Sequence, residues 1–129
     1  GDIDGALDHF RLSLEILQGS GRLESRHGAM AQGNVGYCLF MKGALDEALP
    51  LLSAGLRTLE ALGLLMNPDA SLMLNTIGEV LLQQSKPGEA CTYFQQAVDI
   101  RIQTGSLETR PGEIVQQNLV EARRRAAVA

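Results

Sequence analysis

The chain has 129 residues, of which 45% are hydrophobic and 20% charged, a composition typical of one soluble globular domain. Its net charge of −4 gives no electrostatic reason to expect a nucleic-acid partner. The one basic run, residues 123–125, is interpreted as a solvated helix end. No stretch of about 18 apolar residues occurs, so the sequence predicts no membrane-spanning segment and no membrane partner.

Only two cysteines are present, Cys38 and Cys91, and they form no Cys-x-x-Cys pair. We therefore expect free thiols in a reduced, cytoplasmic protein rather than a disulfide framework. The sequence begins without methionine, inside what proves to be a repeated pattern, which favours a fragment of a longer protein.

Apolar residues recur three or four positions apart along the chain and predict a series of helices. In chain order, the expected helical segments are 3–18, a segment containing 30–41, 46–62, 70–84, one that begins within the phrase SKPGEACTYF at 85–94, and 113–127. Lys42-Gly43 and residues 85–88 have the chemistry of tight turns. No alternating β-branched run is present, so the predicted fold class is all-α.

The helical segments repeat with a period of 42 residues. Ala6, Ala48 and Ala90 are 42 apart, and so are the glycines that follow three of the predicted helices, Gly21, Gly63 and Gly105. Gly36 and Gly78 share another column, where a missing side chain would let two helices approach closely. We also expect a one-residue slip before the last unit, with Pro68 matching Pro111.

Two segments follow one pattern: Gln32-x2-Val35-Gly36-x2-Leu39 with Ala48-x3-Leu52, and Leu74-x2-Ile77-Gly78-x2-Leu81 with Ala90-x3-Phe94. This pattern resembles the tetratricopeptide repeat family, in its 42-residue, kinesin-light-chain-like subtype. The resemblance implies an α-solenoid of antiparallel helix pairs, a TPR-like superhelix. One domain would span 1–129, divided into a second helix of a truncated repeat (1–21), two repeats (22–63 and 64–105) and a terminal capping helix (106–129).

By this resemblance, the first helix of each pair lines a concave face that binds a peptide or protein segment. Amides on that face could both donate hydrogen bonds to a peptide backbone and accept them from it. The implied partner-binding residues are Met30, Asn34, Tyr37, Met41, Leu72, Asn75, Glu79, Gln83, Gln117, Asn118, Glu121 and Arg124.

Two other functions stay open beside peptide binding. One is a homo-oligomerisation or spacer module of a larger bacterial-type regulator. We expect the first helix to lack cover, so that a homodimer could form through Ile3, Leu7, Phe10 and Leu14. The other is a sensory module that responds to a small ligand or signalling peptide.

The sequence offers no catalytic or metal-binding constellation. His9 and His27 have no cysteine or carboxylate at ligand spacing, and Cys38 has no neighbouring histidine. We therefore expect neither an enzyme nor a cofactor or metal.

Overall fold

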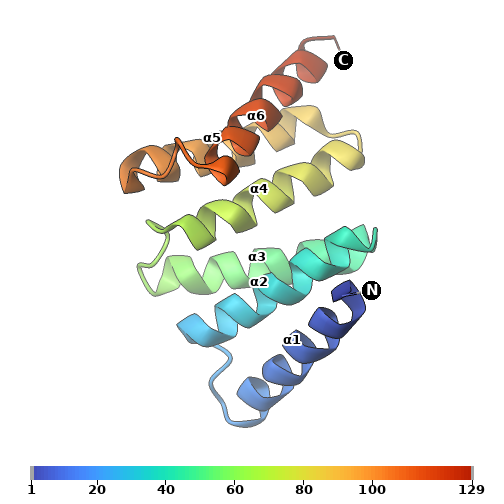
Figure 1. Ribbon diagram of the computed structural model, residues 1–129, viewed down its shortest axis with the longest axis vertical. Coiled ribbons are helices and arrows are strands. Elements are labelled where there is room, and N and C mark those ends of the chain that lie inside the picture. Colours follow the sequence, from blue (N-terminus) through green and yellow to red (C-terminus); the bar gives the residue numbers. More distant parts are fainter. Residues whose placement is uncertain (1, 129) are drawn as a thin grey trace. The chain divides into compact units, whose positions relative to one another are not determined.

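The computed structural model describes residues 2–128, and these residues form six α-helices and no strand (Figure 1). The helices are α1 (Asp2–Gly19), α2 (Arg26–Met41), α3 (Leu45–Ala61), α4 (Pro68–Gln83), α5 (Pro87–Thr104) and α6 (Arg110–Val128). The prediction of an all-α fold is confirmed.

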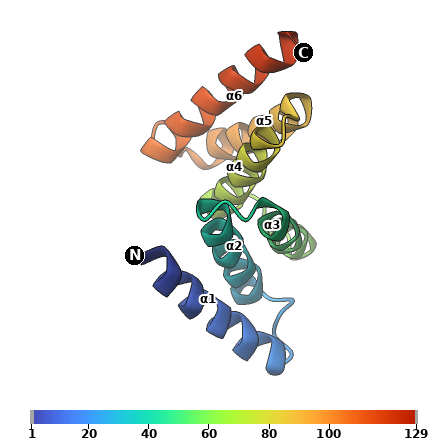
Figure 2. The same ribbon diagram turned by 90° about the vertical axis from the view of Figure 1, so that its right-hand side faces the viewer.

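The chain divides into two compact units, residues 1–64 and 65–129. In the first unit α2 packs against both α1 and α3, and Figure 2 separates α2 from α3, which overlap in Figure 1. In the second unit α5 packs against both α4 and α6, and α4 also contacts α6 directly. Each unit therefore consists of three consecutive helices, of which the middle one packs against both others.

In each unit, two helices meet closely at a glycine. A Cβ atom built on Gly36 of α2 would lie 2.7 Å from Leu52 Cγ of α3. A Cβ atom on Gly78 of α4 would lie 2.4 Å from Phe94 Cε1 of α5. Leu52 and Phe94 are fully buried, at 1% and 0% exposed. The prediction that these two glycines permit close helix approach is confirmed.

The helices α2, α4 and α6 begin in the same way, although the capping residues differ. Ser25 Oγ accepts a hydrogen bond from the Gly28 amide at 3.1 Å. Asn67 Oδ1 accepts one from the Ala70 amide at 3.0 Å, and Thr109 Oγ1 accepts one from the Gly112 amide at 3.2 Å. Each bond satisfies a backbone donor that the first turn of a helix leaves free.

These helix starts follow the 42-residue period without interruption. The helices begin at Arg26, Pro68 and Arg110. The expected one-residue slip is therefore wrong: Arg110 occupies the position of Pro68, and Pro111 is the second residue of its helix. Proline is tolerated at either position because the first-turn amides have no partner within the helix.

Left-handed backbone also recurs in this register. Gly21, Gly63 and Gly105 have φ values of 71°, 71° and 69°. Gly43 and Ser85, which follow α2 and α4, have φ values of 83° and 61°. The turns predicted near residues 43 and 85 are thus present, and both contain a residue in the left-handed backbone conformation.

Candidate functional site

The candidate site in the second unit is the face formed by α4 and α6, which we call the α4/α6 face. A helix places residues three or four apart on one side, so the predicted sets form one stripe on each helix. The stripe on α4 contains Leu72, Asn75, Glu79 and Gln83, and that on α6 contains Gln117, Asn118, Glu121 and Arg124.

Asn118 joins the two stripes. Its Nδ2 atom donates to Asn75 Oδ1 at 2.9 Å and to Glu79 Oε1 at 3.2 Å. Asn75 is only 9% exposed, and its Nδ2 atom has no hydrogen-bond partner within residues 2–128. Asn118 thus uses its amide donors inside the protein, while the Asn75 amide nitrogen remains available as a donor.

Glu79 has an unusual environment for a carboxylate. Burial raises its pKa above the ordinary value, and the hydrogen bond from Asn118 opposes that effect. No ion pair within the described residues compensates the Glu79 charge. A donor or a cation from a binding partner would therefore improve the environment of this carboxylate.

Glu121, one turn beyond Asn118, is in the opposite situation. Arg124 donates to its carboxylate through Nε and Nη2, at 3.2 and 2.5 Å, and Arg125 Nε donates at 2.7 Å. These hydrogen bonds lower the Glu121 pKa to about 2. Glu121 therefore stays ionised at neutral pH, with its charge already matched by the two arginines.

The other stripe residues make no polar contact with this cluster. Leu72 is 43% exposed, and Gln83 and Gln117 are also exposed. The side chains of Gln83 and Gln117 form no hydrogen bond within residues 2–128. They are available to an external partner.

In the first unit, the predicted residues lie on α2. Met30 and Asn34 are half-buried, whereas Tyr37 and Met41 are 40% and 50% exposed. The ring of Tyr37 is tilted by 36° against that of Phe40, with centroids 6.4 Å apart. The surface here is an apolar patch, and the Asn34 and Tyr37 side chains form no hydrogen bond within residues 2–128.

The apolar side of α1 differs from the expectation. Leu7 is 3% exposed, and Ile3, Phe10 and Leu14 are half-buried, because α1 packs against α2. The prediction that these four side chains lack cover is therefore wrong. The large apolar side chains of α1 that do lie exposed are Leu12 and Ile16, at 55% and 57%.

Two surface hollows were not foreseen from the sequence. One, in the second unit, has a volume of about 390 Å³ and lies between α5 and α6. Two of its lining side chains bond each other, because Arg123 Nη2 donates to Gln95 Oε1 at 2.7 Å, and Gln95 Nε2 in turn donates to Asp99 Oδ1 at 2.9 Å.

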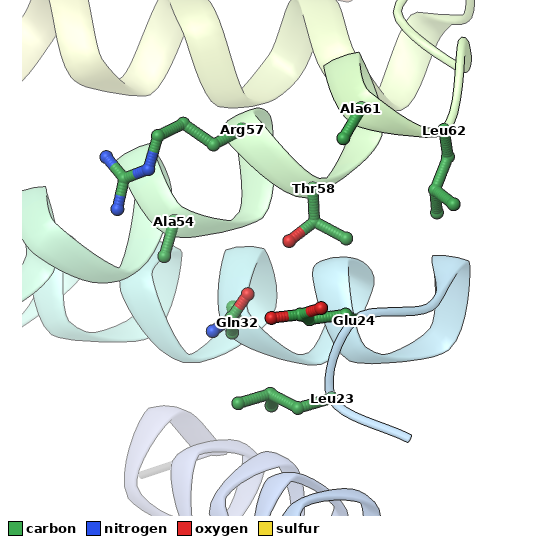
Figure 3. A pocket seen from close by; sticks show the side chains of 8 residues that line it. All are labelled: Leu23, Glu24, Gln32, Ala54, Arg57, Thr58, Ala61 and Leu62. Carbon is green, nitrogen blue, oxygen red and sulfur yellow. The ribbon is translucent and has the colours of Figure 1, made fainter. Parts of the chain in front are cut away.

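The other hollow lies in the first unit, and we call it the Gln32 pocket (Figure 3). It has a volume of about 450 Å³ and is lined by Leu23, Glu24, Gln32, Ala54, Arg57, Thr58, Ala61 and Leu62. A sequence signal for it exists, because Gln32 occupies the column that holds Leu74 in the next repeat.

Within the described residues, no group of three or more His, Cys, Asp or Glu residues is placed to hold a metal ion. Cys38 is buried, and burial raises the pKa of its thiol. Such a shift disfavours the thiolate that a nucleophile or metal ligand requires. None of the helices in residues 2–128 is long and apolar enough to cross a membrane.

No family model matches the chain. A search of curated proteins likewise finds no match.

Proposed function

We propose that this chain is an interaction module of the tetratricopeptide type that binds an extended peptide or protein segment. The repeat architecture is supported by helix starts, N-terminal caps and left-handed turn residues that recur every 42 residues. Stacked units of this kind bury one continuous core and expose an extended binding surface.

The observation that carries the binding proposal is the polar cluster of Asn118, Asn75 and Glu79 on the α4/α6 face. An extended peptide presents unpaired amide and carbonyl groups along its length. The free Asn75 nitrogen can donate to a peptide carbonyl, and the Glu79 carboxylate can accept from a peptide amide. Neighbouring exposed residues, such as Leu72 and Gln83, would contact the side chains of the peptide.

The proposal involves no reaction, cofactor or metal. The two cysteines are free, Cys38 buried and Cys91 half-buried, which supports placement in the reducing environment of the cytoplasm. A sensory role in a larger regulator would use the same face if the bound segment were a signalling peptide.

One observation favours a second candidate, self-association. Leu12 and Ile16 are four residues apart on α1, so they share one face of the helix, and both are more than half exposed. A second copy of the chain could cover them. This interface differs from the one expected through Ile3, Leu7, Phe10 and Leu14.

A displayed library of random peptides tests the binding proposal. We would compare peptides retained by the native chain with those retained by Asn118→Ala, Asn75→Ala and Glu79→Gln. The matched control is Gln103→Ala, because Gln103 is an exposed amide on α5, outside the α4/α6 face. Circular dichroism melting of each variant separates loss of binding from loss of folding.

We expect a common peptide motif that the native chain and Gln103→Ala retain. Folded Asn75→Ala should bind it about tenfold more weakly, as for the loss of a partly buried hydrogen bond to the peptide. Folded Asn118→Ala should weaken binding similarly, because Asn118 positions the side chains of Asn75 and Glu79. Equal retention by all folded variants would overturn the role of this face. A stable dimer that retains no peptide would favour self-association instead.

A further inference from the structure

The Gln32 pocket contains a hydrogen-bond acceptor without a partner. Gln32 Oε1 is buried, and no donor within the described residues reaches it. Buried polar atoms are nearly always hydrogen-bonded, so an orphan beside a cavity indicates that something else supplies the bond. The pocket lies wholly within the first unit, on residues that take no part in the α4/α6 face.

Comparison of the repeats explains why this acceptor is free. The residues at the same position are Leu74 in α4 and Gln116 in α6. Leu74 is 4% exposed and fills its site with apolar atoms. Gln116 folds back, and its Nε2 atom donates to Leu107 O at 3.4 Å and Gly112 O at 3.2 Å. Gln32 does neither, and the pocket of about 450 Å³ lies beside it.

The other polar groups of the pocket are also unengaged. The Glu24 carboxylate and the Thr58 hydroxyl have no hydrogen bond or ion pair within residues 2–128. In Figure 3 the Thr58 hydroxyl points toward Gln32 and Glu24, whereas the Arg57 guanidinium extends away from them. One end of the pocket therefore gathers acceptors, including one negative charge.

The remaining walls are apolar. Leu23 comes from the segment before α2, and Ala54, Ala61 and Leu62 come from α3 and its end. Mostly apolar walls with a few convergent polar groups are typical of small-molecule sites, and the volume lies at the small end of their range.

We propose that the Gln32 pocket binds a small primary amine with an apolar substituent. An ammonium group carries three N–H donors and one positive charge, which suit Gln32 Oε1, Thr58 Oγ1 and the Glu24 carboxylate. Because Gln32 Oε1 is buried in the structure, binding requires a rotation of the terminal amide that exposes this oxygen to the pocket, about a torsion with a broad energy minimum. The apolar substituent packs against Leu23 and Leu62.

The test is a titration of the full 129-residue chain, labelled with ¹⁵N, followed by amide chemical shifts. The probes are 2-phenylethylamine, 2-phenylethanol and 3-phenylpropanoic acid, which share an apolar body and differ in the polar group. We expect the amine to shift amides of the pocket residues saturably. The alcohol should bind about threefold to fivefold more weakly, since it lacks the charge that pairs with Glu24, and the acid should cause no saturable shift there.

Two variants locate the effect. Glu24→Gln should lower the amine affinity to that of the alcohol, whereas Glu60→Gln, an exposed glutamate of α3 outside the pocket, should not. Gln32→Leu copies Leu74, removes the unpaired acceptor and should abolish binding of the amine while the chain stays folded. The proposal fails if the amine does not shift the amides of the pocket residues, which would mean that the pocket holds only water. It also fails if all three probes shift them equally, or if Glu24→Gln binds the amine as the native chain does.

Discussion

Ser85 adopts a backbone conformation that residues other than glycine, asparagine and aspartate rarely adopt. Its φ of 61° lies in the left-handed region, where a Cβ atom approaches the following carbonyl oxygen. In the preceding repeat, Gly43 occupies the corresponding position with a φ of 83°. The turn after α4 thus contains strain that the turn after α2 lacks.

We therefore expect Ser85→Gly to raise the free energy of unfolding by about 1 kcal/mol. The larger conformational entropy of glycine in the unfolded chain offsets part of this gain. The reciprocal change, Gly43→Ser, should lower it by a similar amount. Urea denaturation followed by circular dichroism measures both. A Ser85→Gly variant less stable than the native chain would show that the serine compensates its strain elsewhere.

Glu79 makes stability depend on pH in an unusual direction. Its folded pKa is raised above the reference value of 4.5, so the folded state holds the proton more tightly than the unfolded state. This group therefore lowers stability as pH rises from the unfolded pKa through the raised folded value. The cost is fully present above that window and absent below it.

Glu79→Gln removes the charge and keeps an oxygen that can accept from Asn118. We expect this variant to be more stable than the native chain at pH 7 and nearly equal to it at about pH 3.5, below the unfolded pKa. Denaturation at the two pH values measures the difference. Glu108→Gln, an exposed glutamate between α5 and α6, is the control. A destabilised Glu79→Gln at pH 7 would contradict the assigned cause.

At the scale of helices, the contact between α4 and α5 depends on the absence of one side chain. A methyl group on Gly78 would meet three ring atoms of Phe94 at 2.4 to 2.8 Å. Phe94 is 0% exposed, so its ring cannot move out of the way into solvent. The two helices would have to separate, which disturbs the packing of the second unit.

We expect Gly78→Ala to destabilise the chain by up to about 2 kcal/mol, because strain of about 1–3 kcal/mol is offset by a gain in helix propensity of about 1 kcal/mol. Gly5→Ala is the matched control: Gly5 is also helical, but a Cβ atom there meets nothing within 4 Å. That variant should be more stable by about 0.5–1 kcal/mol. Thermal unfolding distinguishes the two, and a Gly78→Ala variant as stable as Gly5→Ala would contradict the close contact.

The helices themselves could be predicted from the sequence because their apolar period is regular. Apolar spacing placed helices at 46–62 and 70–84, and the structure has them at Leu45–Ala61 and Pro68–Gln83. The start of α6 was missed by a few residues. The expected slip took the two prolines as equivalent, whereas the caps at Asn67 and Thr109 set the register.

The candidate site was less predictable, since it depends on contacts between helices. The helical periodicity of the sequence identifies which residues share one face of a helix. It does not reveal that Asn118 donates hydrogen bonds to both Asn75 and Glu79. Nor does it reveal that the Gln32 oxygen lacks a partner while Gln116 finds one. Identical residues at equivalent positions differ here because side-chain rotation, which sequence spacing does not describe, decides the outcome.

For the molecule as a whole, net charge decides how strongly copies repel each other. The chain carries a charge of −4 at pH 7 and has an isoelectric point near 5.1. Repulsion between copies therefore disappears near pH 5, and exposed apolar residues can then meet. Leu12 and Ile16 form such a pair on α1.

We expect light scattering to show a larger mean mass near pH 5 than at pH 8. A double change, Leu12→Gln with Ile16→Gln, should reduce this association without altering the charge. Ile102→Gln is the control, because Ile102 is equally exposed at 56% but stands alone on α5. Association that persists in the double variant and disappears in the control would place the interface elsewhere.

The three capping residues of α2, α4 and α6 differ in type but perform the same function. A hydroxyl in Ser25 and Thr109 and an amide oxygen in Asn67 accept the same bond from the same backbone position. Substitutions among such residues change the folding energy little, so segments of one repeated geometry can differ in the residues that form it. The similarity of such segments therefore lies in their hydrogen-bond donors, acceptors and side-chain volumes, and sequence identity underestimates it.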